Sequence, residues 1–299
     1  MLNTASAGAR PPDPPVAPAA SPGLDALLRF HASLGLYAAV ARGAFRRHST
    51  YRAATLAGVF TNTVFGCILA YTFVALWQAR PGLGGYDVSQ AITFIWVCQG
   101  LMPTTAIFGG GFEDDVQTRF RNGDIAVDLY RPVDFLGWWL ASDLGRAGYH
   151  LLVRGGAPLL IGSLLFHFRL PERPLTWLVF LLSVLLAEVV SFGLRFLVAL
   201  TGFWLHDSEG VRSVTLVVTM FLSGMLLPLT LFPGGLADLA RVLPWATLAQ
   251  VPADLFLEHT TGAAVLGPLG LQLGWAAALL AAGRGVQALA TRKVVVQGG

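Results

Sequence analysis

The sequence predicts an all-α integral membrane protein with six transmembrane helices, an N-terminal interfacial helix and a re-entrant outer hairpin before the sixth span. The first observation is composition: 55% of the residues are hydrophobic, 12% are charged, and the mean hydropathy is +0.62. A soluble chain of this length would carry roughly twice that charge. The second observation is a series of long apolar stretches, and the third is the placement of the basic residues. The net charge of +3 is too small to indicate a nucleic-acid partner.

Six stretches of the sequence have the length and apolar character that a helix needs to cross a bilayer, which is about 20 residues. We predict spans at about 54–77, 90–112, 147–168, 175–201, 213–232 and 264–289. An even number of spans places both termini on the same side of the membrane.

Basic residues gather on one side of this predicted topology. With the N-terminus inside, fourteen of the twenty lie in inner segments: Arg10, Arg29, Arg42, Arg46, Arg47, Arg52, Arg119, Arg121, Arg131, Arg146, Arg212, Arg284, Arg292 and Lys293. Only four lie in outer segments, namely Arg80, Arg169, Arg173 and Arg241. Because inner loops carry the excess of Lys and Arg, both termini are predicted to be cytoplasmic.

The N-terminal region precedes the first span and has two parts. Residues 1–23 are rich in proline and lack an apolar run, so they are predicted to form a disordered cytoplasmic tail. Residues 24–47 carry apolar side chains on one helical face, with Arg29 and Arg47 opposite. This pattern predicts a helix lying on the inner leaflet; an ordinary packed helix is the alternative.

The longest inner segment, about Glu113–Leu140, separates the second and third predicted spans. It is too polar to be buried, and its apolar residues are spaced as in short amphipathic helices broken at Asn122-Gly123. Pro132 ends the second piece. Asp124 and Asp128 are four residues apart and would share a helical face, on which charges without a partner in the chain suit the surface of another protein.

The segment of about Leu227–Thr261, between the fifth and sixth spans, is half apolar and is broken by prolines, among them Pro228, Pro233, Pro244 and Pro252. Such a segment on a membrane face predicts a re-entrant pair of short helices, which is tolerable only when packed on protein. A structured extracellular loop is the alternative.

Two ionisable residues fall inside predicted spans, where they are costly. Arg154 and Glu188 both lie roughly 10 Å from the inner face at 1.5 Å per residue. They are predicted to form a pair between the third and fourth spans, with either a structural role or a role in substrate passage.

The chain lacks the residues that most enzymes need. Its single lysine, Lys293, lies near the C-terminus, so a phosphate-binding loop of the GxxxxGK[ST] type is excluded. The histidines and two cysteines form no metal-ligand or catalytic spacing. We therefore predict no catalytic, cofactor-binding or metal-binding residues, and any ATP hydrolysis must occur on another chain.

A family resemblance is carried by Arg121–Asp134, which reads RNGDIAVDLYRPVD, and more weakly by the outer run from Gly224. These motifs, within a domain of about 24–295, resemble permease subunits of ATP-binding-cassette exporters of the type-2 class, particularly a bacterial six-span subfamily. The resemblance implies that the inner loop couples to the ATPase. Its expected coupling residues are Arg119, Arg121, Gly123, Asp124, Asp128, Arg131 and Pro132.

The resemblance also implies the partners. Two permeases, identical or related, would combine with a dimer of ATPase subunits that binds ATP and Mg²⁺, in the plasma (inner) membrane of a bacterium. The alternative is a secondary transporter or another polytopic membrane protein that works without an ATPase, for which Glu188 and Pro103 offer the only hints.

Overall fold

The computed structural model describes residues 22–205 and 209–297, and every regular element in these two ranges is a helix. The chain divides into two units, residues 1–36 and residues 37–299. The described part of the first unit is the beginning of α1 (Pro22–Thr50). The predicted tail lies outside the described residues except for its last two positions. The helix predicted over 24–47 is present in α1, and its position on the inner leaflet remains a prediction.

Three stretches of the described chain are long and apolar enough to cross a membrane: Arg52–Ala79, Pro174–Phe203 and Gly262–Arg292. They contain α2 (Arg52–Ala79), α8 (Pro174–Leu200) and most of α12 (Leu266–Gln297). These helices correspond to the first, fourth and sixth predicted spans. Exposed leucine and phenylalanine side chains along α2, such as Leu56 and Phe60, suit contact with lipid.

The other predicted spans are divided or shorter. α3 (Val88–Thr104) ends before the predicted boundary, since Ala106, Gly109 and Gly110 adopt left-handed backbone conformations that no helix continues. The third span is built from α6 (Phe135–His150), a π-helical turn (Leu151–Gly155) and α7 (Gly156–Leu165), and α9 covers only Glu209–Leu222. A count of six spans therefore remains a prediction.

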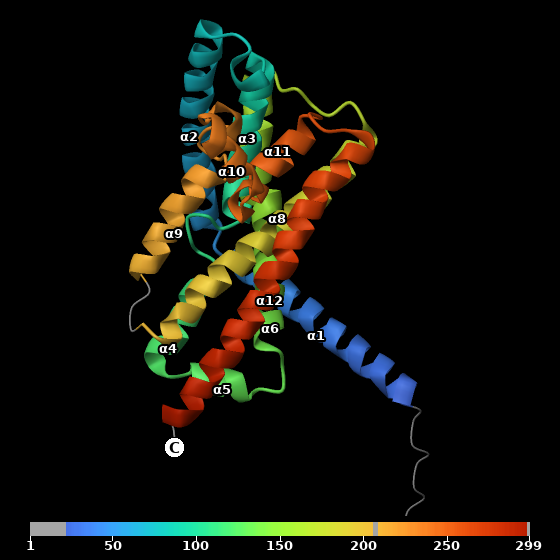
Figure 1. Cartoon of the computed structure of the whole chain (residues 1–299), viewed down its shortest axis with the longest axis vertical. Helices are drawn as coiled ribbons and strands as arrows, with labels where there is room; N and C mark the ends of the chain where they lie inside the picture. The colour runs from blue at the N-terminus through green and yellow to red at the C-terminus, as the bar shows by residue number, and fades with distance from the viewer. Residues whose placement is uncertain (1–21, 206–208, 298–299) are drawn as a thin grey trace, which may run out of the picture. The chain divides into compact units, whose positions relative to one another are not determined.

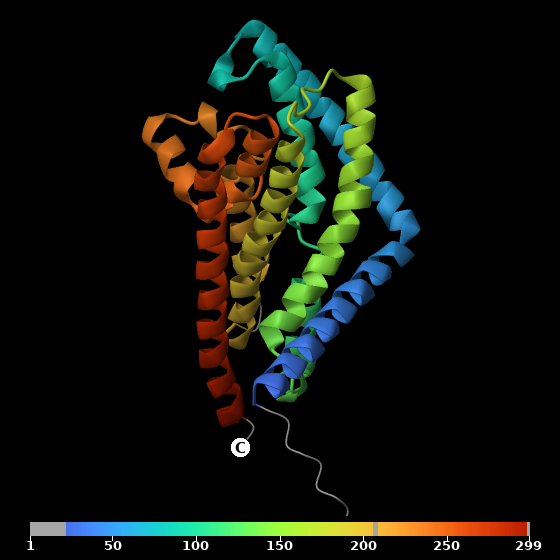
Figure 2. The same ribbon diagram turned by 90° about the vertical axis from the view of Figure 1, so that its right-hand side faces the viewer.

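The α6–α7 run lies beside α2 and α3 in the second unit (Figure 2). Small residues permit the close approach: a Cβ on Gly155 would lie 2.5 Å from the carbonyl oxygen of Gly100, and Gly162 faces the ring of Trp96. On the other side, α8 packs along α12. The main hydrophobic core combines residues of α2, α3, α8 and α12. It contains Trp77, Trp96 and other fully buried aromatic side chains.

The segment before α12 folds into short helices that pack near the end of the helices remote from α4 (Figure 1). They are α10 (Gly234–Val242), α11 (Gln250–Phe256) and the 3₁₀ turns Leu229–Leu231, Pro244–Thr247 and Gly262–Val265. Gln250 holds them together: its amide nitrogen donates to Tyr86 (3.0 Å) and Asp254 (2.8 Å), and its amide oxygen accepts from the backbone N–H of Leu229 (2.9 Å).

The prolines expected in this segment have different environments. Pro228, Pro244 and Pro252 are buried, whereas Pro233 is exposed. A segment packed so closely on protein meets the requirement for a re-entrant hairpin, and its depth in the bilayer remains a prediction.

The opposite end of the second unit carries α4 (Phe112–Asn122), α5 (Ile125–Tyr130) and the C-terminal part of α12 (Figure 1). Two further 3₁₀ turns complete the described elements, Leu83–Gly85 after α2 and Thr201–Phe203 after α8.

The topology can be tested with single cysteines in a Cys67→Ala, Cys98→Ala background, since both native cysteines are free. We expect Asn122→Cys, at the exposed end of α4, to react with an impermeant maleimide only in inverted vesicles. Glu172→Cys, in the exposed α7–α8 loop, should react only in right-side-out cells. The opposite pattern at either site would overturn the orientation inferred from the basic residues.

Candidate functional site

The candidate functional site begins with α4 and α5, which form a short helical elbow at residues 112–130. α4 is followed by Gly123, whose φ of 77° is the left-handed conformation that favours glycine at a helix C-terminus. Asp128 of the elbow is buried and forms ion pairs with Arg119 (2.7 Å) and with Arg131, the residue after α5 (3.1 Å). The guanidinium of Arg119 also lies over the ring of Trp139 on α6. The elbow is therefore a defined unit, packed on α6.

Three consecutive acidic residues in the first turn of α4 bind three different helices. Glu113 pairs with Arg195 of α8 (3.0 Å), and Asp114 pairs with Arg212 of α9 (2.5 Å). Asp115 accepts two hydrogen bonds from Arg47 in the last turn of α1, at 2.7 and 3.2 Å. Acidic residues also suit this position because the helix N-terminus is electropositive. A displacement of α4 would therefore be transmitted through these ion pairs to α1, α8 and α9.

The Arg47–Asp115 pair joins the last turn of α1, which precedes α2, to the first turn of α4. Its hydrogen bond and negative charge raise the pKa of the Arg47 guanidinium above the ordinary value. Both side chains are substantially exposed, so this pair contributes little stability by itself. Its role is to hold the last turn of α1 against the first turn of α4.

The Glu113–Arg195 pair belongs to a buried charged cluster made of Glu113, Asp143, Arg146, Glu188 and Arg195. Arg195 contacts Glu113, Asp143 and Glu188, while Arg146 contacts Asp143 (2.5 Å) and Glu188 (2.9 Å). The Asp143, Arg146 and Glu188 side chains are at most 3% exposed. Three carboxyl groups face two guanidinium groups, and Oε2 of Glu188 has no hydrogen-bond partner. The cluster joins α4, α6 and α8.

The cluster also holds the end of α3. Arg146 donates to the carbonyl oxygens of Pro103 (3.0 Å) and Thr104 (2.8 Å), which have no helical partner because α3 stops there. Ser191 donates to the carbonyl of Thr105 and accepts from Arg195. The cluster therefore connects the end of α3 to the elbow across the 106–110 segment.

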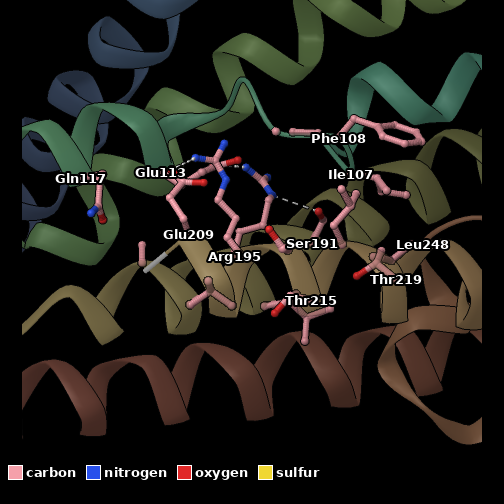
Figure 3. Close-up of a pocket in the computed structure, with 18 residues that line it drawn as sticks. Ile107, Phe108, Glu113, Gln117, Ser191, Arg195, Glu209, Thr215, Thr219 and Leu248 are labelled. Atoms are coloured by element: carbon pink, nitrogen blue, oxygen red, sulfur yellow. Dashed lines mark hydrogen bonds and ion pairs between the residues drawn. The ribbon is translucent and has the colours of Figure 1, made fainter. Parts of the chain in front are cut away.

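A cavity of about 310 Å³ adjoins this cluster. It has a polar half, where Glu113 and Arg195 lie together and Gln117 lies farther along α4, and an apolar half formed by Ile107, Phe108 and neighbouring leucines (Figure 3). Its walls come from α4, α8, α9 and the 106–109 segment. The volume and mixed lining are typical of a small-molecule site.

The predicted Arg154–Glu188 pair is replaced by other partners. Glu188 binds Arg146 and Arg195, and the described residues contain no ion pair to Arg154. Counting residues along each predicted span placed Arg154 and Glu188 at a similar depth. That count does not show which face of each helix points toward the other. Arg146, predicted to lie outside the third span, is the residue whose helical face meets Glu188.

The predicted coupling residues differ in their exposure to solvent. Arg121, Gly123, Asp124 and Pro132 are exposed, whereas Asp128 is buried inside the elbow with Arg119 and Arg131 as its partners. The expectation that Asp128 carries a charge without a partner in the chain is thus wrong. The exposed apolar surface of the elbow is instead provided by Val127 and Tyr130, which are 58% and 84% exposed.

The fold and the site define a polytopic helical membrane protein whose long helices are joined by buried charges to a short polar elbow. Residues 63–297 match the family described as ABC-2 family transporter protein, and the chain belongs to this family. It is thus a membrane permease component of a type-2 ABC transporter. A search of curated proteins finds no match.

Proposed function

We propose that the chain is the permease subunit of an ATP-driven exporter in a bacterial inner membrane and that its elbow binds a separate ATPase subunit. In this proposal both termini are cytoplasmic, and ATP and Mg²⁺ bind to the ATPase. A second permease, identical or related, completes the translocation pathway.

The observation that carries the proposal is the fastening of α4 by three consecutive acidic residues to α1, α8 and α9. A loop that merely connected two helices would not need ion pairs to three others. Because Glu113 is nearly buried, its tie to Arg195 is screened little by salt and can transmit force. These ion pairs would allow the elbow to transmit a movement of a partner protein to the helices α1, α8 and α9.

The exposed face of the elbow supports the second part of the proposal. Val127 and Tyr130 are exposed large side chains on α5, and aromatic residues are favoured in protein interfaces. Closure of an ATPase dimer against this face would displace α4. The ion pairs would then carry the displacement to α8 and α9, which line the 310 Å³ cavity.

The test is co-expression of the chain with candidate ABC ATPase subunits, followed by purification through a tag on the permease. We expect the two to co-elute and to hydrolyse ATP in lipid nanodiscs. An ATPase with its Walker lysine replaced should co-elute without hydrolysis. Reconstituted permease that transports substrate along an ion gradient without any ATPase would overturn the proposal in favour of a secondary transporter.

A further inference from the structure

A second cavity, of about 150 Å³, lies on the other side of the 106–110 segment. It is lined by residues of α2, α3, α6 and the π-helical turn. Its lining includes Gly58 and Phe65 of α2, Phe108 of the 106–110 segment, and the basic residues Arg146, His150 and Arg154. It shares Ala106, Phe108 and Gly109 with the larger cavity, so one segment separates the two.

The π-helical turn Leu151–Gly155 places Arg154 at this cavity. Such turns are rare and occur frequently at functional sites. Gly155 lets the turn approach α3, as its contact with Gly100 shows, and Gly58 leaves room on α2. A Cβ at position 58 would lie 2.5 Å from Nη2 of Arg154, so the guanidinium occupies the space that a larger residue would fill.

The cavity is lined by basic residues, one of which lacks an ion-pair partner among the described residues. Its lining contains Arg146, His150 and Arg154, and no aspartate or glutamate. Arg146 is neutralised by the charged cluster, whereas Arg154 has no ion pair among the described residues. Nε of Arg154 and Nδ1 of His150 are both buried without a hydrogen-bond partner. An unpaired arginine at this depth of a membrane protein is costly, so a counter-ion is expected.

The rim of the cavity is apolar. Phe65 and Phe108 both line it and are 57% and 52% exposed. At 1.5 Å per residue, Gly58 lies about 9 Å and Phe65 about 20 Å from the start of α2. An ionic group in the cavity would therefore have apolar surface beside it at acyl-chain depth. The volume is too small for a drug-sized molecule but suffices for a phosphate or carboxylate group.

We propose that this cavity binds a phosphate or carboxylate group, with Arg154 as its charged ligand and His150 as a second donor. Arginine suits this role because its planar fork matches both anions. The bound group is either the head of an anionic amphiphile, whose tail would lie along Phe65 and Phe108, or a free anion. The proposal concerns binding alone and does not depend on coupling to an ATPase.

The test uses the purified full chain and compares Arg154→Gln with Arg169→Gln, an exposed arginine in the α7–α8 loop. Thermal unfolding is followed in detergent with added phosphatidylglycerol, phosphatidylcholine or inorganic phosphate, and lipid retention is measured by native mass spectrometry. We expect phosphatidylglycerol or phosphate, but not phosphatidylcholine, to stabilise the wild type and Arg169→Gln. Arg154→Gln should bind the anion roughly tenfold more weakly or worse.

Arg154→Gln removes an unpaired charge, so the variant is expected to fold at least as well as the wild type. Gly58→Leu provides a second variant that keeps Arg154 but fills its space; the larger residue also favours the helix. Protection by phosphatidylglycerol alone assigns a lipid head group, and protection by phosphate assigns a free anion. Equal anion binding by the wild type and both cavity variants, or no anion binding at all, would overturn the site.

Discussion

Replacing Arg195 with leucine is expected to remove most of the folded protein. The substitution leaves Glu113, Asp143 and Glu188 with Arg146 as the remaining guanidinium of the cluster. Losing one partner of a buried ion pair costs on the order of 3–5 kcal/mol, because the other charge stays buried without compensation. The loss should appear as a lower yield of monodisperse protein in size-exclusion chromatography and as a lower unfolding temperature.

Two controls separate this effect from general intolerance. Arg169→Leu removes an exposed arginine whose contact with Glu172 is 3.9 Å long, and it should behave like the wild type. Glu188→Gln reduces the excess of carboxyl groups in the cluster and should be tolerated far better than Arg195→Leu. A stable, fully expressed Arg195→Leu variant would show that the cluster does not hold α4, α6 and α8 together.

Replacing Tyr130 with alanine is expected to weaken association with the ATPase more than tenfold while leaving the permease folded. Tyr130 is 84% exposed, so its removal leaves no cavity in the chain. Aromatic anchors at protein interfaces cost about 2 kcal/mol or more when truncated. The measurement is recovery of the ATPase with tagged permease, together with ATP hydrolysis of the complex in nanodiscs.

The matched control is Asp128→Ala, which breaks the ion pairs inside the elbow instead of its exposed face. It should reduce association by loosening the elbow and should also lower the unfolding temperature, whereas Tyr130→Ala should leave that temperature unchanged. Undiminished ATPase recovery with Tyr130→Ala and Val127→Ala combined would exclude this face as the docking surface.

Much of this protein could be predicted from the order of its residues. Apolar stretches of about 20 residues predicted the long helices α2, α8 and α12, because backbone groups in lipid must bond within their own segment. Gly123 and Pro132 delimit the second short helix for equally local reasons, the left-handed backbone at Gly123 and the missing N–H of proline. The motif at Arg121–Asp134 indicated the transporter family to which the chain belongs.

The ionic partners were decided only by the tertiary structure. Glu188 pairs with Arg146 and Arg195, not with Arg154, because helix rotation selects which side chains meet, and depth along a span does not reveal rotation. Glu113, Asp114 and Asp115 showed only an acidic helix start in the sequence. Their arginine partners are between 68 and 98 positions away, on three separate helices. Such pairs depend on how those helices pack, which local residue patterns do not encode.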